Sequence, residues 1–75
     1  MIVSFETASG AVFHMYHDNK SFTQEKPILR TGPLWNTPTV LLKHRVVIWT
    51  SSSDEKTVAK VIHTGVVVKR EVCLA

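Results

Sequence analysis

The sequence predicts an α+β fold in which one helix packs on a small mixed β-sheet. Three observations predict this class. Two alternating segments near the N-terminus flank a loop that contains glycine, a helix-capping pattern lies at residues 52–65, and segments rich in β-branched residues stand on both sides of that pattern. The expected order is an N-terminal β-hairpin, a long irregular loop, and then strand, helix and strand.

The hairpin is expected to pair residues 2–6 with residues 11–17 around a loop that ends at Gly10. With Gly10 in the left-handed conformation of a three-residue loop, the register sets apolar residues directly across from one another. The expected pairs are Phe5 with Phe13 and Val3 with Met15. Such pairing gives the hairpin one apolar face that can be buried.

The middle of the chain shows no regular period. Residues 21–30 match neither the helix nor the strand period and are interrupted by Pro27, and residues 31–38 contain one glycine and two prolines. A long irregular loop is therefore expected. Trp35 lies within it and is expected to pack on the core as a lid, because a tryptophan in a loop has much apolar surface to bury.

Residues 39–50 are expected to form a strand, since β-branched residues are frequent after His44. The face expected to be buried carries Val40, Leu42, His44, Val46 and Ile48, and the opposite face carries Leu41, Lys43, Arg45, Val47 and Trp49. His44 would then be a hydrogen-bonded core or edge histidine. A rival interpretation takes Thr37 as an N-cap and Pro38 as the first helical residue, which gives one helical turn before a shorter strand.

Residues 53–64 carry the pattern of a helix. Ser52 and Glu55 have the spacing of a capping box, and Gly65 stands where a left-handed residue ends a helix. The apolar stripe at helical spacing consists of Val58, Val61 and Ile62. Residues 66–74 are expected to form a strand, so strand, helix and strand would make a right-handed parallel crossover.

Length and composition indicate one small domain, residues 1–75, with modest stability. A chain of 75 residues buries only about 60% of the surface that its unfolded form exposes. The single cysteine, Cys73, is expected to be a small buried side chain in a reducing, cytoplasmic setting. No signal-peptide pattern and no apolar run long enough to cross a membrane are present, and pairing with a second copy would supply missing stability.

Motifs for enzymatic chemistry are not found. His14 and His17 are three residues apart, so on a strand they would face opposite sides, and no cysteine or acidic cluster completes a metal site. Cys73 lies near the end of an apolar strand, where a reactive thiolate is not favoured. The three glycines are too scattered for a phosphate loop. We therefore expect no enzyme, no metal and no cofactor.

A basic and aromatic surface is the remaining candidate site. It would consist of Lys43, Arg45, Trp49, Lys69 and Trp35. The net charge is +3, and its whole excess falls in residues 38–75, which tolerates an acidic partner without requiring one. Three apolar residues outside the expected elements would add an exposed apolar surface suited to binding a partner: Phe22, Leu34 and Trp35.

Two functional hypotheses follow. The first is a small intracellular binding protein, a regulator or inhibitor that docks on a larger protein, since Arg and Trp are frequent hot-spot residues. The alternative is a nucleic-acid-binding module that uses charge for the backbone and a ring for base stacking. A structural interpretation also stands, in which Lys43 and Arg45 only solvate one sheet face and protect an edge.

Overall fold

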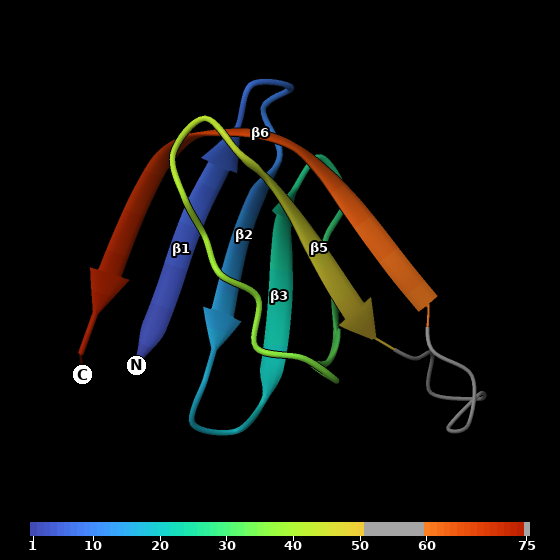
Figure 1. The fold of residues 1–75 in the computed structure, drawn as a ribbon. Coiled ribbons are helices and arrows are strands. Elements are labelled where there is room, and N and C mark those ends of the chain that lie inside the picture. Colours follow the sequence, from blue (N-terminus) through green and yellow to red (C-terminus); the bar gives the residue numbers. More distant parts are fainter. Residues whose placement is uncertain (51–59, 75) are drawn as a thin grey trace.

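The computed structural model describes residues 1–50 and 60–74, which form six antiparallel strands and no helix (Figure 1). The strands are β1 (Ile2–Thr7), β2 (Val12–Tyr16), β3 (Ser21–Lys26), β4 (Arg30–Pro33), β5 (Arg45–Thr50) and β6 (Lys60–Cys73). They form one sheet in the order β4-β3-β2-β1-β6-β5, which curls into a half-barrel. The predicted α+β fold with a helix on a mixed sheet is therefore wrong.

The predicted N-terminal hairpin is confirmed. β1 pairs with β2 in the expected register, with Phe5 opposite Phe13 and Val3 opposite Met15. The two phenylalanine rings stack with their centroids 5.1 Å apart. Gly10 has a φ of 88°, a conformation that costs glycine little, and its N–H donates to the Thr7 carbonyl.

The middle of the chain is more regular than predicted, because β3 and β4 occupy part of the expected loop. Phe22 and Gln24 both point into the core from β3. A polar residue at a buried position conceals the strand period in the sequence. Its amide is satisfied, since the Gln24 Nε2 donates to the Lys26 carbonyl and the Arg30 Nε donates to the Gln24 Oε1. β4 is a short edge strand, and residues 34–38 form no strand.

The strand predicted over residues 39–50 begins only at Arg45. From there the predicted alternation holds, with Val46 and Ile48 buried and Trp49 exposed. Before it the chain turns, with Lys43 at a φ of 68°, so His44 is exposed and does not face the core. The rival helical turn at Thr37 and Pro38 is also absent.

The predicted helix over residues 53–64 is wrong where the structure describes it. Residues 51–59 lie outside the described residues, and Lys60 to Thr64 begin β6 instead. β6 is antiparallel to both its neighbours, pairing with β5 in its first part and with β1 in its second, so the parallel crossover is wrong as well. Its β-branched residues suit a strand, and long-range pairing on two sides outweighs local capping signals.

The core lies inside the curl of the sheet. It consists of Val3, Phe5, Phe13, Met15, Phe22, Leu34, Val40, Val46, Ile48 and Val67. Leu34 and Val40 come from the irregular segments after β4 and before β5, and the yellow-green segment before β5 crosses the sheet (Figure 1). These segments close much of the open side of the half-barrel. Among the described residues, no helix has the length and apolar character that crossing a membrane requires.

Candidate functional site

An exposed surface with three large apolar side chains lies on the outer face of β5 and the first part of β6. We call it the ribbon face, and it consists of Arg45, Val47, Trp49, Val61 and His63. Trp49 lies directly opposite Val61, and Val47 lies opposite His63. Trp49 is 45% exposed, Val47 38% and Val61 40%. The strand alternation that buries Val46 and Ile48 therefore presents these side chains to solvent together.

Trp35 lies beside the ribbon face. Its backbone N–H donates to the Trp49 carbonyl over 2.8 Å, and its side chain is 45% exposed. Trp35 was predicted to pack on the core as a lid, and this is wrong. The preceding residue, Leu34, is the one buried in the core, with 7% of its surface exposed. Phe22 and Leu34 are buried, so the apolar surface predicted for Phe22, Leu34 and Trp35 is wrong for the first two. Of these three residues only Trp35 is exposed.

The basic residues predicted with Trp49 do not form one cluster. Arg45 shares the ribbon face with Trp49, as predicted. Lys43 stands in the turn before β5, and its left-handed conformation removes it from the strand alternation. Lys69 lies opposite Glu6 in the second part of β6, on a different surface. Neither β5 nor residues 60–66 contain Asp or Glu, so the ribbon face is apolar and weakly basic.

Comparison of the chain with protein-family models, with curated proteins and with solved structures found no match.

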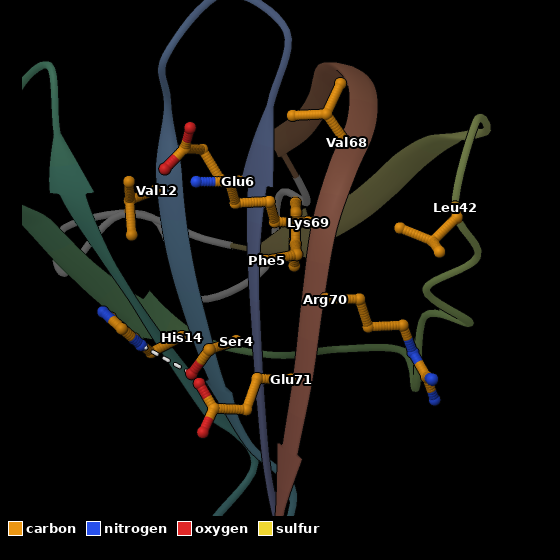
Figure 2. Close-up of a pocket in the computed structure, with 10 residues that line it drawn as sticks. All are labelled: Ser4, Phe5, Glu6, Val12, His14, Leu42, Val68, Lys69, Arg70 and Glu71. Carbon is orange, nitrogen blue, oxygen red and sulfur yellow. Dashed lines mark hydrogen bonds between the residues drawn. The ribbon is translucent and has the colours of Figure 1, made fainter.

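A second surface is a trough along the ladder between β1 and the second part of β6 (Figure 2). Its volume is about 540 Å³, and it is lined by Ser4, Phe5, Glu6, Val12, His14, Leu42, Val68, Lys69, Arg70 and Glu71. A polar contact crosses three strands at one end. A hydrogen bond of 2.8 Å joins the Ser4 Oγ to the His14 Nδ1, and the His14 Nε2 lies 3.0 Å from the Glu25 Oε2.

A hydroxyl, an imidazole and a carboxylate in a row are the groups that nucleophilic catalysis requires. Acyl transfer also requires N–H donors for the developing oxyanion. The Ser4 backbone takes part in the ladder between β1 and β6, so its N–H is not available for that purpose. We interpret the row as a cross-strand contact. The predicted hairpin register, with Phe5 opposite Phe13, already implies that Ser4 lies opposite His14, as the structure shows.

Two further predictions concern metal ligands and the cysteine. Among the described residues, no group of three or more His, Cys, Asp or Glu side chains is placed to hold a metal ion. Cys73 is exposed, so the expected burial of this thiol is wrong. The reason is that the second part of β6 is covered by β1 on one side only, which leaves residues 68–74 exposed.

Proposed function

We propose that this protein is a small, non-enzymatic regulator or inhibitor that docks on a larger protein through the ribbon face. The observation that carries this proposal is the side-by-side exposure of Val47, Trp49 and Val61 on two paired strands. Isolated exposed apolar residues are ordinary, but a contiguous group that includes a tryptophan is typical of an interaction surface.

The chemistry of the ribbon face suits a protein partner. Trp and Arg are the residue types that most often dominate binding energy, and Trp49 and Arg45 stand on one face of one strand. The surface is also preorganised, because Val46 and Ile48 anchor the same strand in the core. A partner would therefore lose little binding energy to ordering this face. The single thiol is compatible with a reducing cytoplasmic compartment, where we expect the docking to occur.

The proposal is tested by affinity capture from the native host with matched variants. Trp49→Ala and Arg45→Glu should each lose a partner that the unchanged protein retains, while the thermal unfolding midpoint stays nearly unchanged. Leu29→Ala is the control, because Leu29 is 75% exposed and belongs to neither β5 nor β6. Equal capture by all four proteins would show that the ribbon face is not the docking site.

A nucleic acid is the second candidate partner, and the absence of acidic residues from the ribbon face favours it. Arg45 could neutralise a phosphate while Trp49, on the same face of β5, stacks on a base. Fluorescence anisotropy with labelled oligonucleotides at two salt concentrations separates the candidates. Binding that neutralises phosphates weakens steeply as salt rises, whereas an apolar docking surface responds little.

A further inference from the structure

The second part of β6 has one edge that no strand covers. In an extended strand, the N–H and C=O of one residue point to the same edge, and successive residues alternate. The Thr7 N–H bonds to the Ala11 carbonyl and the Met1 carbonyl accepts from His17, so odd-numbered residues of β1 face β2. The even-numbered residues of β1 must then face β6.

This alternation fixes the orientation of the β6 backbone. Ile2, Ser4 and Glu6 lie opposite Cys73, Glu71 and Lys69. These three β6 residues therefore exchange hydrogen bonds with β1. Arg70 and Val72 lie between them, so their N–H and C=O groups point to the opposite edge. That edge is free, since no backbone hydrogen bond to it exists among the described residues.

The free edge begins at a defined place. Val67 is the last residue along this edge whose backbone is hydrogen-bonded to the segment before β5. Its carbonyl accepts from the Lys43 N–H, and its N–H donates to the His44 carbonyl. Leu42 stands next to this cap and is 54% exposed. Figure 2 shows Leu42 across a gap from β6, with Arg70 extending from the strand toward the same side. Leu42 and the edge border one end of the trough.

Residues 68–73 carry two basic side chains, Lys69 and Arg70, and one acidic side chain, Glu71, so the net positive charge of this edge favours an acidic occupant. Lys69 and Arg70 are both exposed, and neither has an ion pair among the described residues. Arg70 shares the face of Phe5, and Lys69 shares the face of Glu6. An added antiparallel strand would place successive side chains next to Arg70 on one face and Lys69 on the other.

We propose that the free edge of residues 68–73 binds an extended acidic segment of a partner protein, which adds to the sheet as an antiparallel strand. Main-chain bonds to Arg70 and Val72 hold the segment, as in other cases of strand addition. The register calls for an apolar residue opposite Val72 and acidic residues opposite Arg70 and Lys69. This inference goes beyond the proposed function, because it uses the backbone of β6 and not the ribbon face.

A second copy of the chain fits this edge less well. Two identical edges pair antiparallel about a two-fold axis, so the residue on the axis lies opposite the same residue of the second copy. Centred on Arg70 or on Glu71, the pairing sets like charges directly opposite each other, which destabilises a sheet. Centred on Val72, it extends to Leu74, which lies beyond the end of the strand.

The test uses the fluorescein-labelled peptide TVTEEVT and fluorescence anisotropy. Aligned antiparallel, its first valine meets Val72 and its two glutamates meet Arg70 and Lys69. N-methylation of the first glutamate removes the N–H that bonds to Arg70 and should weaken binding at least about tenfold. N-methylation of the preceding threonine is the matched control, because that N–H points away from β6, and binding should persist.

Variants of the protein complete the test. Arg70→Glu should weaken binding at least about tenfold, and Val72→Pro should do the same by removing an outward N–H. Trp49→Ala should leave peptide binding unchanged, which separates this site from the ribbon face. No binding at millimolar peptide, equal loss with both methylations, or equal binding of TVTKKVT would overturn the proposal. A dimer in sedimentation that Val72→Pro converts to monomer would assign the edge to a second copy instead.

Discussion

β5 and the second part of β6 are both edges of the curled sheet, but only one of them is covered. On β5, the Asn36 side chain donates to the Val47 carbonyl and accepts from the Trp49 N–H, and the Trp49 carbonyl accepts from Trp35. On β6, the outward groups of Arg70 and Val72 have no such partners among the described residues. The covered edge leaves only side chains for binding, whereas the open edge offers backbone.

The two ends of the sheet approach each other, so the half-barrel nearly closes. Strands β4 and β5 stand at opposite ends of the strand order, yet Gly32 on β4 lies close to Thr50 on β5. A Cβ at Gly32 on β4 would lie 2.9 Å from the Thr50 Oγ1 on β5 and 3.2 Å from the Phe22 Cε1. A side chain at this position of β4 would therefore have to displace Thr50 or Phe22, which glycine avoids.

Proline substitution distinguishes the two edges of β6 most strongly. Glu71→Pro removes an N–H that bonds to β1 and should lower the free energy of unfolding by about 3 kcal/mol or more, a large part of the stability of a small domain. Val72→Pro removes an N–H that points to solvent, so its free energy of unfolding should change little. Urea unfolding of both variants measures this difference. Equal destabilisation would mean that the orientation of the β6 backbone is not as described.

Alanine at Gly32 should disturb the near-closure of the barrel. The added methyl group meets Thr50 and Phe22, and we expect a loss of about 1 to 3 kcal/mol in the free energy of unfolding. Gly65→Ala is the matched control, because its Cβ would meet nothing nearer than 3.4 Å. That control should be neutral or slightly stabilising. Thermal unfolding should therefore separate the two variants clearly, and similar midpoints would contradict the close approach of β4 and β5.

Removing the Asn36 side chain should uncover the edge of β5. Asn36→Ala deletes two hydrogen bonds, to Val47 and Trp49, and should cost about 1 to 2 kcal/mol. Hydrogen exchange at the Trp49 amide should accelerate by more than exchange in β1. Asn19→Ala is the control, since within residues 1–50 and 60–74 the Asn19 side chain accepts a hydrogen bond only from the nearby Ser21 hydroxyl. An unchanged exchange rate at Trp49 would show that Asn36 does not cover this edge.

The smallest expected effect is at Lys43, which caps β6 with its backbone and holds a φ of 68°. A side chain in this region is strained, so Lys43→Gly should be neutral or stabilising by up to about 1 kcal/mol. The same variant removes the Lys43 charge, which the sequence predicted to be part of the basic and aromatic binding surface. If partner capture by Lys43→Gly equals that of the unchanged protein, Lys43 acts through its backbone alone. Destabilisation would contradict the left-handed turn.

The sequence predicted those parts of the fold in which local chemistry and burial agree. The hairpin of β1 and β2 and the alternation of β5 follow from Gly10 and from apolar residues at every second position. Arg45 and Trp49 were placed on one exposed face for the same reason. β3 was missed because Gln24 is buried, and its hydrogen bonds to Lys26 and Arg30 are not visible in a hydropathy pattern.

β6 was missed for a different reason. Ile62, Thr64 and Val67 point inward only because β5 and β1 are there to pair with, which is a property of the whole sheet. A capping box and a glycine stop are local signals worth about 1 kcal/mol each, and pairing along fourteen residues outweighs them. The free edge at Arg70 and Val72 depends on which neighbour each residue faces, so composition and spacing alone could not have revealed it.

The central claim, that the ribbon face docks on a protein, is tested most directly by site-specific photo-crosslinking in the native host. A benzophenone amino acid replaces Val61, which lies opposite Trp49 on the ribbon face, in one protein and the exposed Leu29 in a matched control. We predict a discrete protein adduct from position 61 that position 29 does not form, and that Arg45→Glu abolishes. Adducts of equal yield from both positions, or a nucleic-acid adduct at position 61 alone, would contradict the account.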